Sequence, residues 1–436
     1  MAFTEKKLGL SLSGGGYRAA AFHLGTLKKL HEMGLLESID VISTISGGSI
    51  IGAYYCLHKD DFARFEKDAY EKLQRDNIIN RVVFSATSLG LLVMVMALIF
   101  PAFYFLFTGR PWFFLGLLTL FVVLLLKFQF YIFPVSKGIE KAYDAFFYNN
   151  KTLGDLCAFP EIVIGSTNIQ TARPFSFSKN YMGDSDYDHR SEPVTFYPTA
   201  FPLSRAVMAS SCVPFAFTPV SISQVFFTDP CQAAKVHPLL VDGGVYDNQG
   251  IHKLTQRGRF DCSHIITSDA GGGSKGELSF RNTITLLVAT VDVFMARIKK
   301  AQMVSDIYEN AATANREIAY LPLAWDIENC IPGFIRNLGK GYIIASVIEA
   351  LELRPEWVRQ PKEYAAEITA WLEERTGYQK ILAAAPTPAE KTIARNTGTN
   401  LTSLSKKKVD CLMKQAACLT ELQVKLYCPS LLKQAP

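Results

Sequence analysis

The apolar positions in the first sixty residues follow two different spacings in turn. Leu8–Leu12 and Val41–Ile45 are short apolar runs, with the length expected of buried strands. Each precedes a segment with apolar positions at helical spacing, Ala19–Leu30 and Ile50–Leu57 respectively. Strands that alternate with helices in this way predict an α/β fold with a central, mostly parallel sheet covered on both faces.

Two much longer apolar runs interrupt this alternation. Ser85–Phe107 contains no charged residue, and Trp112–Pro134 contains only Lys127. At about 1.5 Å per residue, either run is long enough to cross a hydrocarbon core of about 30 Å. Since Thr108–Pro111 between them has the composition of a turn, the pattern predicts a transmembrane helical hairpin inserted into the α/β domain. A buried core hairpin and a lid are the alternatives.

The charges around this hairpin predict its orientation. Arg75, Arg81, Lys137 and Lys141 lie on its outer flanks, whereas the short turn contains a single arginine. Positively charged flanks are retained on the cytoplasmic side of a membrane. We therefore expect an integral membrane protein, in a bacterial inner membrane, whose globular part is cytoplasmic.

The remainder of the chain predicts further α/β structure and a helical end. The strands expected here are Glu161–Asn168, Gln224–Phe227, Leu239–Val241 and His264–Ser268. Helices are expected at Ser204–Ser211, at Leu286–Lys300 and through most of 340–430, apart from a loop at 386–400. The expected domains are an α/β domain in two parts, 6–83 and 136–275, the hairpin at 84–135, and a mainly helical region at 276–436.

Composition narrows the classes of function. The 436 residues have a formal net charge of +5 and no long lysine–arginine block, which argues against nucleic acid as a partner. The nine cysteines include no Cys-x-x-Cys pair, so we expect reduced thiols in a cytosolic compartment. No cluster of Asp, Glu and His has metal-ligand spacing, and no apolar segment precedes the first strand. We therefore expect neither a metal site nor a signal peptide.

Ser46 lies where a predicted strand turns into a helix. The strand Val41–Ile45 leads into it, and Gly47 and Gly48 supply a tight backbone after it. In α/β enzymes such a turn exposes a nucleophilic serine and leaves the next backbone N–H free to hold an oxyanion. A glycine-rich turn with a solvated serine is the alternative.

A second glycine-rich turn follows the first predicted strand. Gly14, Gly15 and Gly16 are consecutive and lead into a predicted helix, so their N–H groups are unobstructed at the positive end of the helix dipole. Arg18 adds a permanent charge that can grip a phosphate or hold the loop in place. The Gly-x-Gly-x-x-Gly fingerprint of a dinucleotide site is absent. The loop therefore predicts an anion site.

Asp242 provides a carboxylate at the end of another predicted strand. It follows the apolar run Leu239–Val241 and precedes Gly243 and Gly244, which form a tight turn. An ordinary Asp-Gly turn is the alternative, because such turns are frequent. The pattern makes Asp242 a candidate partner for the serine.

Taken together, these stretches resemble the patatin-like phospholipase family. The glycine loop resembles the family's oxyanion loop, Ser46 with its two glycines resembles the nucleophile elbow, and Asp242 with its two glycines resembles the catalytic aspartate motif. Ser204–Pro214 is similar to the family's segment ahead of the aspartate strand. One position departs from the elbow pattern Gly-x-Ser-x-Gly, because Thr44 stands where the first glycine belongs.

The resemblance implies a three-layer α/β hydrolase in which Ser46 and Asp242 act as a catalytic dyad, with no cofactor and no metal. Arg18 would support the loop or the substrate. The implied oxyanion donors are the N–H groups of Gly14, Gly15, Gly16 and Gly47. The implied substrate is a phospholipid or lysophospholipid of a membrane bilayer, cleaved at a fatty-acyl ester.

Other interpretations of the same residues stay open at this point. The chain order Ser46, Asp242 and then His252 or His264 would also suit a catalytic triad, although neither histidine lies in a predicted catalytic loop. A membrane-bound scaffold without turnover is a second class, supported only by Thr44. A soluble esterase for small acyl esters is a third, and the apolar hairpin argues against it.

Overall fold

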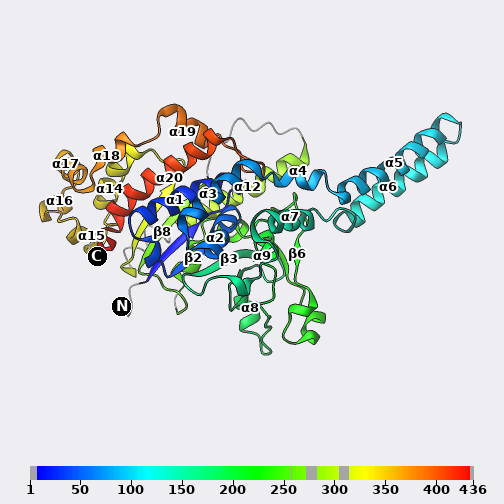
Figure 1. Cartoon of the computed structure of the whole chain (residues 1–436), viewed down its shortest axis with the longest axis horizontal. Helices are drawn as coiled ribbons and strands as arrows, with labels where there is room; N and C mark the ends of the chain where they lie inside the picture. The colour runs from blue at the N-terminus through cyan, green and yellow to red at the C-terminus, as the bar shows by residue number, and fades with distance from the viewer. Residues whose placement is uncertain (1–6, 257, 272–281, 304–313, 433–436) are drawn as a thin grey trace.

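The computed structural model describes residues 7–256, 258–271, 282–303 and 314–432 (Figure 1). Its centre is a nine-stranded sheet in the order β5-β4-β3-β2-β1-β8-β9, with β7 paired to β3 and β6 paired to β7. The strands are β1 (Leu8–Leu12), β2 (Val41–Ile45), β3 (Glu161–Asn168), β4 (Arg173–Phe177), β5 (Met182–Gly183), β6 (Val220–Ser221), β7 (Leu239–Asp242), β8 (His264–Asp269) and β9 (Glu317–Pro322).

Helices surround this sheet and make up most of the C-terminal region. Those between residues 16 and 302, besides the hairpin, are α1 (Gly16–Glu32), α2 (Gly47–His58), α3 (Phe62–Arg75), α4 (Ile78–Val83), α7 (Val135–Tyr143), α8 (Ser185–Asp188), α9 (Leu203–Ser210), α10 (Gly244–Asp247), α11 (Ile251–Thr255) and α12 (Thr283–Gln302). Those of the C-terminal region are α14 (Cys330–Gly339), α15 (Ala345–Ala350), α16 (Pro355–Arg359), α17 (Ala365–Thr376), α18 (Tyr378–Ala383), α19 (Pro388–Arg395) and α20 (Lys406–Tyr427).

The sheet is mixed, which corrects the expectation of a mostly parallel one. Strands β3, β2, β1, β8 and β9 form a parallel core, whereas β4, β5, β6 and β7 pair antiparallel at one side. Connection length explains the difference, because β1 reaches β2 through α1 whereas only residues 169–172 separate β3 from β4. A helical crossover permits parallel pairing, and a short loop restricts two strands to a hairpin.

Both faces of the parallel core are buried, since successive side chains of a strand point to opposite faces. Leu10, Ile42 and Ile266 join the large core that also contains side chains of α1, α2 and α20. Val41 and Ile265 pack on the other face with side chains of α11. The central sheet is therefore covered on both sides, as the strand–helix alternation predicts.

The apolar hairpin consists of α5 (Ala86–Phe107) and α6 (Pro111–Ile132), which contact each other and project away from the α/β domain (Figure 1). Their apolar stretches are only 6% and 0% buried, so the alternative of a buried core hairpin is wrong. Length and composition would allow each helix to cross a membrane, but two such helices do not by themselves establish a span.

Two local expectations differ from the structure, and four strands, β4, β5, β6 and β9, were not predicted. Gln224–Phe226 is a short 3₁₀ helix rather than a strand. The loop expected at 386–400 contains α19, in which Thr387 and Glu390 form a reciprocal capping box, a start signal present in the sequence. Strand β9 adds a parallel edge that the sequence patterns do not predict.

Candidate active site

Ser46 lies at the turn from β2 into α2 in a backbone conformation that few residues adopt. Its φ is 50° and its ψ is −115°, and its N–H donates to the Ser210 hydroxyl at 2.9 Å. The neighbouring Gly47 lets the two loops approach, because a Cβ there would lie 2.2 Å from the Gly16 carbonyl oxygen. Strained turns of this kind are typical of a nucleophile elbow.

The glycine loop from β1 into α1 lies against this elbow. The N–H of Gly14 donates to the Asn248 carbonyl at 3.0 Å, whereas no described residue accepts from the N–H groups of Gly15, Gly16 and Gly47. The φ values of Gly15 and Gly16 are 143° and 59°, which favour glycine. Gly14 therefore braces the loop, and the other three expected donors are the ones left for an oxyanion.

Asp242 ends β7 beside both loops. Its carboxylate accepts a hydrogen bond from the Gly244 N–H at 2.7 Å, and it lies near Ser46, because Ser210 accepts from both the Ser46 N–H and the Gly243 N–H. Burial raises the pKa of Asp242 to about 6, and the Gly244 N–H and the nearby Ser46 side chain oppose the rise. A Cβ at Gly14 would lie 3.3 Å from Ser46 Cβ and 2.3 Å from Asn248 Oδ1, so the glycine loop, the elbow and Asn248 meet here. The structure thus brings together the serine, the aspartate and the glycine loop.

The family model for patatin-like phospholipase matches residues 10–255, more than half of the chain. The chain belongs to the patatin-like phospholipase family. Its members hydrolyse lipid esters, so the chain is a lipid hydrolase at the level of the family. The matched range contains all the residues of the site described above.

Solved structures and curated sequences add less. VipD from Legionella pneumophila is 13% identical, with a TM-score of 0.32 over 100% of this chain and 88% of its own. Human GIVD cytosolic phospholipase A2 is 13% identical, with a TM-score of 0.43 over 99% of this chain. The chain spans 62% of that human protein's length. Among curated proteins, no sequence matched the chain.

Arg18 supports the patatin-type glycine loop from behind. Its side chain is buried, and Nη1 donates to the Thr397 carbonyl at 3.2 Å. Gly16, two residues before Arg18, also lies against this segment, because a Cβ there would lie 2.4 Å from the Asn400 carbonyl oxygen. Of the two roles open to Arg18, this geometry favours holding the loop over gripping a phosphate.

The histidines have partners away from the dyad. His23 is fully buried and bonds the Ser13 carbonyl at 2.9 Å and the Ser268 hydroxyl at 2.8 Å. Burial lowers the pKa of His23 to about 4, so it braces the loop as a neutral side chain. His264 bonds the hydroxyls of Ser263 and Ser430 at the opposite end of β8 from the site. The contacts of His264 argue against a triad that uses it, and the ring of His252, the other candidate, packs edge-on against Tyr246.

Thr44, the departure from the elbow pattern, is accommodated by a glycine one element further on. A Cβ at Gly52 of α2 would lie 2.7 Å from Thr44 Cγ2. The hydroxyl of Thr44 is also used, because Oγ1 accepts from Ser49 at 3.0 Å and lies 3.4 Å from the Val163 carbonyl. In the elbow pattern a glycine at the position of Thr44 leaves this space, and here Gly52 of α2 leaves it instead. Thr44 was the only support for a scaffold without turnover, and this fit removes that support.

Two residues of the site were not predicted. Ser210 accepts from the Ser46 N–H and donates to the Gly165 carbonyl at 2.6 Å, so it holds the elbow onto β3. Asp269 is fully buried at the end of β8 and bonds Lys299 of α12 at 2.6 Å. Two sequence features could have identified them. Ser210 lies in the segment that resembles the family, and Asp269 directly follows a predicted strand.

Proposed function

We propose that the chain is a membrane-anchored serine acyl hydrolase, of the phospholipase A or lysophospholipase type, that uses Ser46 and Asp242 as a dyad. The observation that carries this proposal is the buried Asp242 carboxylate beside Ser46, which lies at a strained elbow and shares Ser210 as a hydrogen-bond partner with the Asp242 turn. The substrate class follows from the family and from the apolar hairpin, which would hold the site beside a bilayer.

The reaction begins when the Asp242 carboxylate takes the proton from Ser46 Oγ as that oxygen attacks the ester carbonyl carbon. The N–H groups of Gly15, Gly16 and Gly47 donate to the oxyanion that forms, and each such donor is typically worth about 3 kcal/mol of barrier. Collapse of the intermediate breaks the ester bond, and Asp242 returns the proton to the leaving alcohol. Water then attacks the acyl-serine in the same way and releases a fatty acid.

The proposed function gives each part of the chain a role. Residues 6–83 and 136–275 form the catalytic α/β domain and 84–135 anchor it to the membrane, whereas 276–436 form a mainly helical region that also adds β9 to the sheet and α20 to its core. The hairpin links the first and second parts without separating Ser46 from Asp242, because both of its ends return to the α/β domain. The membrane substrate would then reach the site from the bilayer that holds the hairpin.

The test compares the Ser46→Ala variant with the unaltered protein in cells and in purified form. We expect Ser46→Ala to abolish both fluorophosphonate labelling and release of fatty acid from long-chain phospholipids. A Ser43→Ala variant, which changes a buried serine of the same strand, controls for packing and should keep both. Near-normal turnover by a folded Ser46→Ala variant would refute the assignment. Lipid profiles of the two cell lines would identify the head group and the acyl position.

A further inference from the structure

The C-terminal region contains a groove that the proposed reaction does not use. It lies between α14 and α17 and has a volume of about 990 Å³. Ligand pockets typically range from about 300 to 1,000 Å³, so the groove can hold a sizeable small molecule. Figure 1 places α14 and α17 at the end of the molecule opposite the hairpin, so the groove is remote from the proposed membrane anchor.

One side of the groove is basic. Arg336, Lys340 and Lys362 line it, and none of the three forms an ion pair with any residue that the structure describes. Arg336 and Lys340 lie at the C-terminal end of α14, where cations complement the helix dipole. Lys362 comes from the segment before α17, so the dipole of α14 does not explain why it joins them.

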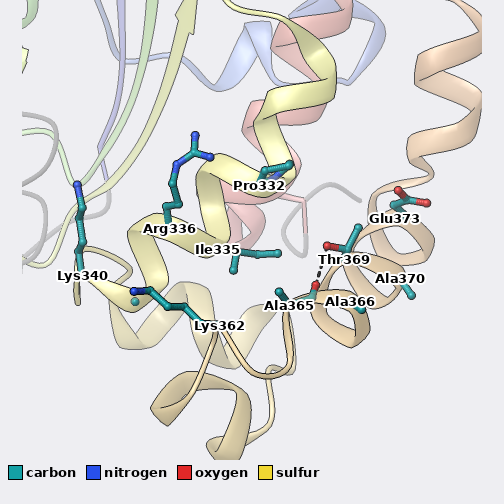
Figure 2. Close-up of a pocket in the computed structure, with 11 residues that line it drawn as sticks. Pro332, Ile335, Arg336, Lys340, Lys362, Ala365, Ala366, Thr369, Ala370 and Glu373 are labelled. Atoms are coloured by element: carbon teal, nitrogen blue, oxygen red, sulfur yellow. Dashed lines mark hydrogen bonds between the residues drawn. The ribbon is translucent and has the colours of Figure 1, made fainter.

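The other side of the groove is apolar and made of small side chains. Ala366 and Ala370 are one turn apart on α17, and with Ala365 they line the groove together with Ile335 and Pro332 of α14 (Figure 2). The one hydroxyl on this wall is satisfied within the helix, because Thr369 donates to the Ala365 carbonyl at 2.7 Å. Apart from the carboxylate of Glu373 at one end, which accepts from Gln379 at 3.1 Å, this wall offers only apolar contact.

We propose that this groove binds an amphiphile with one acyl chain and an anionic head, either a free fatty acid or a monoacyl phospholipid. The apolar wall would take the chain, and the three exposed basic side chains, whose charged ends lie apart in Figure 2, would close on the carboxylate or phosphate. Charge-assisted hydrogen bonds to such an anion are stronger than those between neutral groups. A bilayer surface is a poorer match, since the groove lies at the opposite end from the hairpin (Figure 1).

The test is photo-crosslinking of the full chain in nanodiscs of zwitterionic lipid, with a diazirine-bearing oleate as the probe. We expect the probe to label peptides from α14 and α17, and both oleate and oleoyl lysophosphatidate to compete. The stronger competitor identifies the natural head group. Monoolein, which has the chain without the charge, and inorganic phosphate, which has the charge without the chain, should compete weakly.

Two variants and one control decide the question. Lys340→Gln/Lys362→Gln removes two cations, and Ala370→Phe places a large side chain on the exposed wall. Each variant should lower labelling of α14 and α17 about tenfold or more, which corresponds to a loss of about 1.4 kcal/mol in binding free energy. Arg359→Gln/Lys380→Gln removes two exposed cations outside the groove and should leave labelling within about twofold. Unchanged labelling in both groove variants, or equal competition by monoolein, would overturn the proposal. The competition is measured in the Ser46→Ala variant, so that neither ester competitor is hydrolysed to oleate and the readout does not depend on whether Ser46 is a nucleophile.

Discussion

The buried, charged Asp242 carboxylate lowers the folding stability of the protein. It is 5% exposed, its carboxylate accepts a hydrogen bond from the Gly244 N–H, and no described cation pairs with it. Burial disfavours the charged form, which is why the pKa rises to about 6. A carboxylate with this pKa is a better base toward a serine hydroxyl than an ordinary aspartate is.

The pH dependence of hydrolysis follows from this pKa. The general base must be ionised, so kcat/KM on a neutral long-chain ester should fall about tenfold per pH unit below about pH 6 and level off above it. The measurement is a pH profile with saturating and subsaturating ester. A fall centred near pH 4, the range of an exposed aspartate, would contradict the role assigned to Asp242.

Replacing Asp242 should separate activity from stability. The pKa of Asp242 in the folded protein, about 6, lies above the value of 3.8 for the free side chain, so the folded state binds more protons between these values. Folding stability therefore falls as pH rises from about 4 to 6, and the loss, up to about 3 kcal/mol, persists above pH 6. We expect Asp242→Asn to abolish hydrolysis yet raise the thermal midpoint at pH 8.

The comparison at low pH is the control for this variant. Near pH 4 Asp242 is already protonated in the folded state, so Asp242→Asn and the unaltered protein should unfold at nearly the same temperature. A lower midpoint for Asp242→Asn at both pH values would mean that the carboxylate stabilises the turn rather than straining it.

At the scale of elements, β2 and α2 fit together through one close contact. Glycine in a helix interior normally costs about 1 kcal/mol relative to alanine, so Gly52→Ala would ordinarily stabilise α2. Here the added Cβ would lie 2.7 Å from Thr44 Cγ2, and overpacking of this kind costs about 1–3 kcal/mol. We therefore expect Gly52→Ala to destabilise the protein and to lower activity at the adjacent elbow.

A second substitution should rescue that variant. Thr44→Ser removes Cγ2 and keeps the hydroxyl that accepts from Ser49. The Thr44→Ser/Gly52→Ala double variant should recover most of the lost stability, with a coupling energy of about 1–2 kcal/mol in a thermal double-mutant cycle. Additive effects would show that the two positions do not share this space.

The glycine loop is likewise held by an element from the far end of the chain. Because Arg18 is buried and bonds the Thr397 carbonyl, Arg18→Ala should lower hydrolysis of phospholipids and of neutral esters by the same factor. The measurement is the ratio of kcat/KM on the two substrates, with the exposed Arg64→Ala as control. A selective loss on the phospholipid would show that the guanidinium meets the head group.

At the scale of the whole molecule, the proposed membrane hairpin would decide where the enzyme works. A single crossing would leave Ser46 and Asp242 on opposite sides of the membrane, since one precedes the hairpin and the other follows it. Strand β3 pairs with both β2, which leads into Ser46, and β7, which ends at Asp242, so the number of crossings must be even. We expect two, with the catalytic domain in the cytoplasm.

Cysteine labelling tests this topology. Thr108 is exposed at the tip of the hairpin and Asp60 is exposed on the α/β domain. In a Cys231→Ser background, which removes an exposed native thiol, an impermeant reagent outside intact cells should label Thr108→Cys and leave Asp60→Cys unlabelled. Protection of both would favour a lid or a re-entrant hairpin, and extraction by carbonate would exclude a span.

The sequence by itself determined the features that depend on residues close together in the chain. The elbow at Ser46, the loop Gly14–Gly16 and the two apolar helices each occupy one continuous segment, so strand, turn and helix signals were enough to place them. The capping box of α19 was equally local and was overlooked. Local signals also gave the parallel core, because a strand–helix–strand order leads to parallel pairing.

The tertiary structure decided every contact between distant segments. The antiparallel insertion of β7 beside β3 carries Asp242 to Ser46, and no local pattern specifies that pairing. The fit of Gly52 to Thr44, the bond from Arg18 to Thr397 and the groove between α14 and α17 depend in the same way on packing. The physical reason is that backbone propensity acts over a few residues, whereas the order of strands and the packing of helices are set by how all the apolar surfaces are buried at once.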